Sequence, residues 1–248
     1  MITIIIHMLF IDYCKAIFRK QQFMPTWISI FVNSNYFVRK GIYHGIQKNS
    51  HFMKGKMLDF GCGIKPYQSL FQVEQYIGVD IENKGHSNDI SKVDFFYDGH
   101  TLPFADNSFD SVFTSEVLTH IFNIDEIMLE LYRVLKPGGC ILVTVPFVWY
   151  ENETPNDSVR YTFFGVKYLF EKYGFRIEKI NKSGSFFLTA LQMMIAFLYT
   201  HLFPRKVWLK IILTFIFISP LNILGIIFSK LLPKNNEFYQ NIILIAKK

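Results

Sequence analysis

The chain has 248 residues, which suffices for one domain of about 150 residues and a sizeable appendage. Half of the residues are hydrophobic, and the mean hydropathy of +0.21 is high for a wholly soluble protein, while the net charge of +6 suits an anionic membrane surface as well as nucleic acid. The three cysteines, Cys14, Cys62 and Cys140, lack metal-ligand spacing and imply no disulfide framework, so a reducing compartment is expected.

The N-terminal segment is unusually apolar. Residues Met1–Ile11 lack the positive leader and the small-residue cleavage site of a secretory signal. We expect a helix there that packs on the domain or lies at a membrane interface. A second helix is predicted over Phe37–Asn49, just before the first strand of the core.

The central motif is Met57-Leu58-Asp59-Phe60-Gly61-Cys62-Gly63, followed by a second apolar run that ends at Asp80. This pattern predicts a strand, a glycine turn, a helix and a second strand. Gly61 and Gly63 allow a sharp turn and the close approach of a ligand. Asp80 lies 19 positions after Gly61 and can accept hydrogen bonds from ribose hydroxyls. The motif therefore predicts a nucleotide site at the carboxyl edge of a parallel sheet.

The glycine spacing narrows the choice of nucleotide. A dinucleotide fingerprint has a third glycine three residues after the second, which brings a helix N-terminus close to a pyrophosphate. Pro66 occupies that position here. The loop is therefore better suited to a ligand without phosphates.

The next segments continue the α/β pattern. A third strand is predicted over Val93–Tyr97, and Asp98-Gly99 after it offers an acceptor for an adenine amino group. Three further elements follow in order: a strand over 109–113, a helix over 125–135 that is stopped by Lys136-Pro137-Gly138-Gly139, and a buried strand over 140–145.

From about Lys56 to Ile180 these motifs resemble the class I S-adenosylmethionine-dependent methyltransferases of the type 11 group. Leu58–Gly63 is similar to the first motif of that family, and Arg133–Gly139 is similar to its most recognisable string. Ser115–Ile121 resembles the motif after the fourth strand, with Thr119 where the family usually has Glu. The resemblance implies S-adenosylmethionine as cofactor, held by Asp59, Gly61, Cys62, Gly63, Asp80, Ile81, Asp98, Gly99, Ser115 and Glu116.

The same resemblance suggests an acceptor side of the site. His120 is the candidate catalytic base. Alternatively, His120 is structural and forms a hydrogen bond to the next loop. Arg160 and Tyr161 are candidate acceptor-binding residues, although Arg160 alternatively pairs only with Asp157 or Glu153. Their segment is similar to one in a subset of the family linked to cell-surface glycan or lipid pathways, but Asn152 replaces a His of that subset. No metal site and no nucleic-acid partner are expected.

The C-terminal part carries an insertion. Strands are predicted over Phe175–Ile180 and Asn241–Ala246, and residues 184–237 separate them. Phe186–Phe203 and Ile211–Ser229 contain no charged residue, which makes them membrane candidates. Ser219-Pro220 is expected to divide the second run into 207–218 and 220–232, each too short to span a bilayer. Five cations flank the runs: Arg205, Lys206, Lys210, Lys230 and Lys234.

The sequence therefore predicts an α/β protein with a Rossmann-like, seven-stranded methyltransferase sheet and an apolar helical insertion between the last two strands. Its expected parts are N-terminal helices (1–55), the cofactor-binding core (56–183), the insertion (184–237) and the last strand (238–248). The expected protein is a cytoplasmic methyltransferase that is associated with a membrane and acts on a lipid-linked acceptor. A soluble small-molecule methyltransferase whose insertion is a lid or homodimer contact, and a non-catalytic cofactor-binding module, remain alternatives, as do monotopic and spanning arrangements.

Overall fold

The computed structural model describes residues 20–82 and 92–248, so the predicted helix over Met1–Ile11 lies outside the described residues. The chain packs as two compact units. Positions 44–183 and 239–248 form what we call the core unit, and positions 1–43 and 184–238 form the helical unit. The sequence predicted residues 1–55 and the insertion 184–237 as separate parts. In the structure, positions up to Tyr43 belong to the same unit as the insertion.

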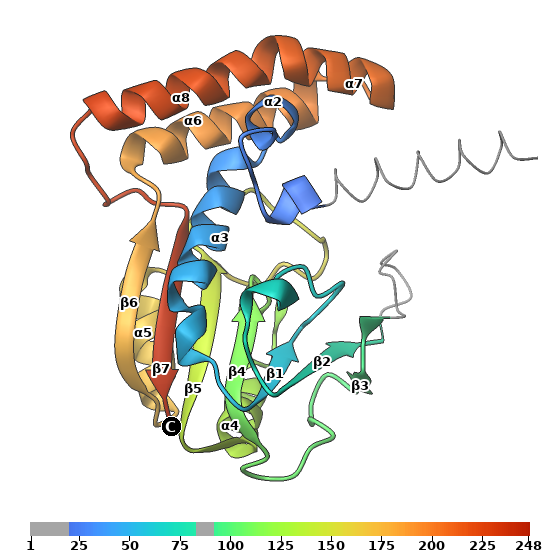
Figure 1. The fold of residues 1–248 in the computed structure, drawn as a ribbon, viewed down its shortest axis with the longest axis vertical. Helices are drawn as coiled ribbons and strands as arrows, with labels where there is room; N and C mark the ends of the chain where they lie inside the picture. The colour runs from blue at the N-terminus through green and yellow to red at the C-terminus, as the bar shows by residue number, and fades with distance from the viewer. Residues whose placement is uncertain (1–19, 83–91) are drawn as a thin grey trace, which may run out of the picture. The chain divides into compact units, whose positions relative to one another are not determined.

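The core unit is built on a seven-stranded sheet with the order β3-β2-β1-β4-β5-β7-β6 (Figure 1). The strands from β1 to β5 pair in parallel, and β7 is antiparallel to both β5 and β6. This arrangement confirms the predicted fold class. The strands are β1 (Lys56–Phe60), β2 (Gln75–Ile81), β3 (Phe95–Tyr97), β4 (Phe109–Ser115), β5 (Leu135–Pro146), β6 (Arg176–Ser183) and β7 (Asn241–Lys247).

Helices cover both faces of this sheet. The helices α4 (Ile124–Val134) and α5 (Phe163–Lys172) pack their apolar stripes into the main hydrophobic core, together with Ile242 and Leu244 of β7. Ile243 points to the opposite face, because side chains alternate along a strand, and there it contacts Gly45 of α3 (Tyr36–Asn49). Figure 1 shows the end of α3 in front of the sheet and α4 and α5 behind it.

One local prediction in the core is wrong. The connection from β1 to β2 holds no α-helix but only the 3₁₀ turn η2 (Gln68–Leu70), since Lys65 has a positive φ of 53° and Pro66 lacks a backbone N–H. The helix predicted over 125–135 is α4, which ends at Val134, just before Lys136–Gly139. These four residues belong to the start of β5, where Gly138 and Gly139 pair with Lys248 through two backbone hydrogen bonds of 3.0 and 3.1 Å.

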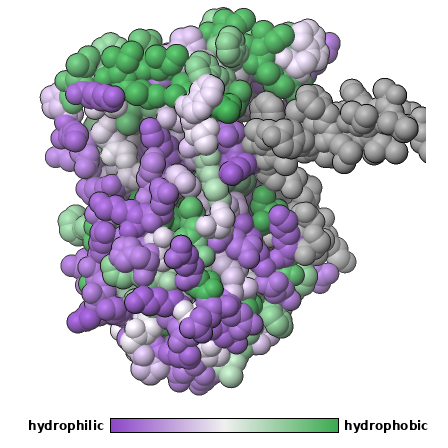
Figure 2. Space-filling view, in the orientation of Figure 1, coloured by the Kyte–Doolittle hydropathy of each residue, from purple (hydrophilic) through white to green (hydrophobic). Residues whose placement is uncertain are grey.

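The helical unit consists of short, apolar helices. It contains α2 (Ser29–Val32), the first part of α3, α6 (Phe186–Phe197), the π-helical turns η5 (Leu198–Leu202) and η6 (Thr214–Ile218), α7 (Val207–Leu213) and α8 (Ser219–Leu231). Figure 2 shows hydrophobic side chains gathered over α7 and α8, whereas most of the visible face of the core unit is hydrophilic.

The predicted break at Ser219-Pro220 is also wrong. Ser219 is itself helical, with φ −58° and ψ −49°, so winding continues from Val207 to Leu231. The wide π turn of η6 ends at Ile218, two positions before Pro220, which cannot donate a helical hydrogen bond. In the described part of the chain this 25-residue helix is the one whose length and composition would let it cross a membrane.

Candidate functional site

The sheet topology places a ligand site next to β1 and β4. From β1 the chain runs outward through β2 and β3, and from β4 it runs outward to β5 on the other side. Ligands of open α/β sheets bind where the strand order reverses, beyond the carboxyl ends of the strands. The ends of β1, β2 and β4 carry Asp59, Asp80 and Glu116, and all three were predicted site residues.

The glycine loop after β1 has the conformation that its sequence requires. Gly61 has a φ of +70°, and a Cβ there would lie 2.4 Å from a methyl group of Val117, so no other residue fits. Gly63 has a φ of +49° and open space where a Cβ would lie. The backbone N–H groups of Gly61 and Cys62 both donate to the carbonyl of Val79. The loop is therefore fixed to β2 on one side and open at Gly63.

Asp80 links this loop to the end of β2. Its Oδ2 accepts a hydrogen bond of 2.8 Å from the backbone N–H of Gly63. Its Oδ1 lies 2.8 Å from the backbone nitrogen of Ile81. An ionised carboxylate offers about four acceptor sites, and ribose hydroxyls are suitable donors to it. Asp80 and Gly63 thus lie together at the carboxyl ends of β1 and β2.

Asp59 is the most perturbed acid of the site. Its side chain is 3% exposed, and burial raises its pKa to about 7, while the hydroxyl of Tyr76, which donates to the carboxylate, opposes this shift. The nearest cation, Lys65, is engaged by Asp94, whose Oδ2 lies 2.5 Å from the ammonium. The Asp59 carboxylate therefore has no ion pair with Lys65, and a cationic group of a ligand could take that place.

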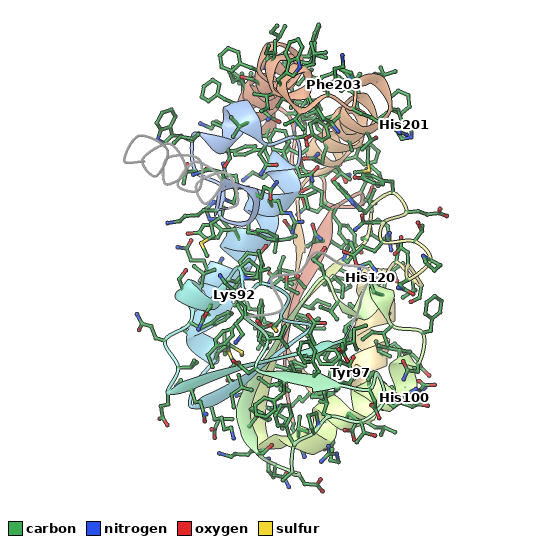
Figure 3. All side chains as sticks on the ribbon, turned by 90° about the vertical axis from the view of Figure 1, so that its right-hand side faces the viewer. Lys92, Tyr97, His100, His120, His201 and Phe203 are labelled. Atoms are coloured by element: carbon green, nitrogen blue, oxygen red, sulfur yellow. The ribbon has the colours of Figure 1, made fainter. Side chains whose placement is uncertain are left out.

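The end of β3 has an open backbone position. Asp98 Oδ1 accepts from the backbone N–H groups of Thr101 and His100, and these two bonds lower the pKa of the carboxyl. Gly99 has a φ of +87° with open space at its Cβ position, and its carbonyl accepts from Asn123. Figure 3 labels Tyr97 and His100, which flank this turn.

A polar network that sequence reasoning missed holds the end of β4. Glu116 has a positive φ of 63°, and its two carboxylate oxygens accept from Thr144 and Asn241, both at 2.8 Å. Ser115 bonds the same threonine hydroxyl at 2.8 Å. Asn241 follows the insertion and is 125 positions from Glu116, so no local sequence signal linked the two residues.

His120 lies in the turn η4 (Leu118–His120) after β4, and it is labelled in Figure 3. Its Nδ1 is 2.7 Å from the carbonyl oxygen of Asn156, so it bonds the next loop. Its Nε2 lies 4.0 Å from Glu153. With a proton on Nδ1, Nε2 keeps a lone pair that can accept a proton.

The predicted acceptor residues have internal partners. Arg160 forms a two-pronged ion pair with Asp157, at 2.5 and 2.6 Å. Tyr161 is 9% exposed and packs in the main core, where burial raises its pKa to about 12. These contacts define a folded loop over 147–161 rather than an open basic pocket.

No metal or thiol chemistry is indicated in the described ranges. They contain no group of three or more His, Cys, Asp or Glu side chains able to hold a metal ion. Cys62 is 3% exposed, and burial raises its pKa far above the usual range, so the thiol stays protonated. Cys62 thus acts as a small residue in the loop.

These residues fit S-adenosylmethionine. The buried Asp59 suits the amino group of a methionine moiety, and Asp80 suits ribose hydroxyls. Gly63 and Gly99 leave open space where a side chain would obstruct a ligand. Pyrophosphate fits poorly, because η2 replaces the α-helix whose N-terminus would bind it.

Comparisons with known proteins agree with this geometry. Residues 58–143 match the family model described as "Methyltransferase domain". The sterol 24-C-methyltransferase erg6 of Aspergillus fumigatus is 29% identical over 143 residues, which cover 46% of this chain and 36% of that protein. Phosphoethanolamine N-methyltransferase 2 of Caenorhabditis elegans is 31% identical over 114 residues, covering 40% and 26% of the two chains. The chain thus spans well under half the length of these curated relatives.

Solved structures support the fold. A phosphoethanolamine N-methyltransferase 2 from Haemonchus contortus, in complex with S-adenosyl-L-methionine, has a TM-score of 0.52 at 18% identity, covering 93% of this chain and 60% of that one. A SAM-dependent methyltransferase from Archaeoglobus fulgidus has a TM-score of 0.50 at 18% identity, covering 82% and 91%.

Proposed function

Because residues 58–143 form a class I S-adenosylmethionine-dependent methyltransferase domain of the type 11 group, we propose that this protein transfers a methyl group to a membrane-resident or lipid-linked acceptor. The observation that carries the proposal is the set of Asp59, Gly63, Asp80 and Gly99 at the carboxyl edge of β1–β3. When bound, the cofactor supplies an activated methyl group on a sulfonium. The protein then needs to align an acceptor with it and to exclude water.

Asp59 and Asp80 have distinct parts in this proposal. Asp59 holds the amino group of the methionine moiety, and the cation favours the ionised carboxylate that burial disfavours in the free protein. Asp80 accepts from the ribose and at the same time holds Gly63 in place through its 2.8 Å bond. Ile81, Asp98 and Gly99 surround the adenine, while Ser115 and Glu116 support the methyl-donor side.

His120 is the proposed base for an acceptor that must lose a proton. The carbonyl of Asn156 orients the ring through Nδ1, which leaves Nε2 as the proton acceptor. Glu153, 4.0 Å from Nε2, would stabilise the imidazolium that forms. Arg160 keeps the loop folded through Asp157, and we propose that it and Tyr161 shape the acceptor side rather than bind a charge directly.

The lipid-linked acceptor is proposed from the helical unit. Its helices expose many large apolar side chains, such as Trp208 at 60% and Leu231 at 73%. Soluble monomers rarely expose contiguous apolar surface of this kind without a partner. The names of the two relatives refer to a sterol and to phosphoethanolamine, which are a lipid and a lipid headgroup precursor. We place the protein on the cytoplasmic face of a membrane, where the cofactor is present.

The first test is cofactor binding by titration calorimetry with S-adenosylhomocysteine and the full-length protein. We expect binding by the natural protein and a loss of at least about tenfold in Asp80→Ala, since charge-assisted hydrogen bonds contribute about 1.5–3 kcal/mol each. Asp106→Ala, an exposed acid away from the site, is the matched control. Equal binding by both variants would refute the placement of the site. Binding without methyl transfer to any cell fraction would favour a non-catalytic module.

A further inference from the structure

Positive charge is concentrated in the helical unit. Its positions contain ten Lys and Arg against the two acids Asp12 and Glu237, a net charge of +8. The core unit contains 16 Lys and Arg against 18 acids, a net charge of −2. The basic character of the protein therefore comes entirely from the part that also carries the apolar helices.

The five cations that flank the apolar runs form no ion pair with a described residue. Lys210 instead lies 4.0 Å above the ring of Tyr199. Arg205, Lys206, Lys230 and Lys234 are exposed. Such cations at the ends of an apolar helix complement the phosphates of anionic headgroups.

One face of the long helix is already occupied by the protein. Ser219, Asn222 and Gly225 are buried, and Asn222 Nδ2 donates to the carbonyl of Ile30 at 2.9 Å. A Cβ on Gly225 would lie 2.4 Å from the ring of Phe37. The segment 30–37 thus holds the middle part of the helix, around Asn222 and Gly225.

The other face is apolar and exposed. Five of its large side chains are between 46% and 73% exposed, namely Trp208, Ile212, Ile216, Ile227 and Leu231. Figure 2 shows hydrophobic side chains gathered over α7 and α8, with paler side chains between them. A helix with one apolar face and cations at its ends is typical of helices that lie in a membrane interface.

Length alone would also allow this helix to span. At about 1.5 Å per residue, 25 residues reach roughly 37 Å, more than the ~30 Å hydrocarbon core. Spanning would, however, carry the bound segment 30–37 towards the bilayer centre together with Arg39 and Lys40, which follow it directly. Charged residues are strongly disfavoured there.

We infer that the exposed face of Val207–Leu231 lies in the plane of an anionic bilayer surface, with Arg205, Lys206, Lys210 and Lys230 among the headgroups. This inference rests on the proposed function in one respect: the bilayer is taken to be the surface that presents the acceptor. The bound partner is a lipid bilayer and not a second copy of the chain.

Flotation of the full-length protein with vesicles tests the inference. We expect binding to vesicles of phosphatidylcholine with phosphatidylglycerol, much weaker binding to phosphatidylcholine alone, and a decline with salt. Lys206→Gln/Lys230→Gln should weaken binding to the anionic vesicles about 25-fold, at about fivefold per lysine. The matched control is Lys48→Gln/Lys54→Gln, which removes two exposed charges from the core unit and should change binding by less than about twofold.

A second pair tests the apolar face. Ile216→Gln/Ile227→Gln should weaken binding to both kinds of vesicle while thermal unfolding shows a folded protein. Equal binding by both lysine variants, or no vesicle binding, would overturn the inference. A dimer in light scattering that this isoleucine pair disperses would assign the surface to a second copy. Cofactor binding, measured on the same samples, should stay unchanged, so loss of vesicle binding is distinguishable from failure of the proposed function.

The depth of insertion separates an in-plane from a spanning helix. In an Ile216→Trp variant whose Trp27, Trp149 and Trp208 are replaced by Phe, quenching by brominated lipids should be strongest for bromines near the headgroups. Strongest quenching by bromines at the chain ends would show a spanning helix and contradict the in-plane arrangement.

Discussion

Replacing Asp59 by Asn should stabilise the free protein and weaken the cofactor site at the same time. Asp59 is buried, and its pKa is raised from 3.8 to about 7. A shift of roughly three units corresponds to roughly 4 kcal/mol, at about 1.4 kcal/mol per unit. This is the upper limit of what ionisation of the buried carboxyl costs the folded protein at alkaline pH.

The sign of the pH dependence follows from the raised pKa. Between about pH 4 and pH 7 the folded state holds a proton on Asp59 that the unfolded state has lost. The natural protein therefore loses stability as pH rises through that window, and the loss levels off above about pH 7. Asp59→Asn has no carboxyl at this position and lacks this component.

Urea unfolding from about pH 5 to about pH 9 measures the difference. We expect the free energy of unfolding of Asp59→Asn to exceed that of the natural protein by a few kcal/mol near pH 8, with a smaller gap near pH 5. Tyr76→Phe, which removes the hydrogen bond that lowers the pKa of Asp59, should extend the loss of stability to higher pH. An Asn variant that is less stable than the natural protein at about pH 8, or a gap independent of pH, would refute this reasoning.

Three further predictions concern the same edge of the sheet. Gly61→Ala should lower the melting temperature and abolish cofactor binding, because its Cβ meets Val117. Gly63→Ala has open space at its Cβ and should cost much less stability, so equal melting temperatures of the two variants would contradict this. Asn241→Ala should cost about 1–3 kcal/mol in urea unfolding by removing a donor from Glu116; Asn241→Asp should cost more, and acidification should relieve part of that cost. Arg160→Gln should destabilise the protein more than Arg160→Gln/Asp157→Asn does, because only the single variant leaves a buried carboxylate unpaired, and a double-mutant cycle checks this.

Local patterns in the sequence were sufficient for the core fold. The buried runs that end at Phe60, Asp80 and Ser115 are strands whose order follows from parallel pairing, and the antiparallel β7 closes the sheet after the insertion. The glycine loop was predictable because Gly61 and Gly63 have the positive φ values that such turns need. The structure after this loop was predicted wrongly as an α-helix, since Lys65 and Pro66 favour the 3₁₀ turn that is found there.

Long-range contacts explain most of what sequence reasoning missed. Tyr76 reaches Asp59 only because β1 and β2 pair in register, with Gly78 opposite Asp59. Asn241 reaches Glu116 only because β7 returns beside β5. The continuous helix through Pro220 depends on the π turn of η6 and on packing of Asn222 and Gly225. The rule that proline interrupts a helix takes neither of these into account.

The most direct measurement is the transfer of a radiolabelled methyl group from S-adenosylmethionine into lipid and soluble extracts that are separated after the reaction. The natural protein and Asp80→Ala would be compared at equal concentration. We predict label in the lipid fraction that depends on Asp80. Label confined to the soluble fraction would contradict the lipid-linked acceptor, and lipid label that persists in Asp80→Ala would contradict the cofactor site itself.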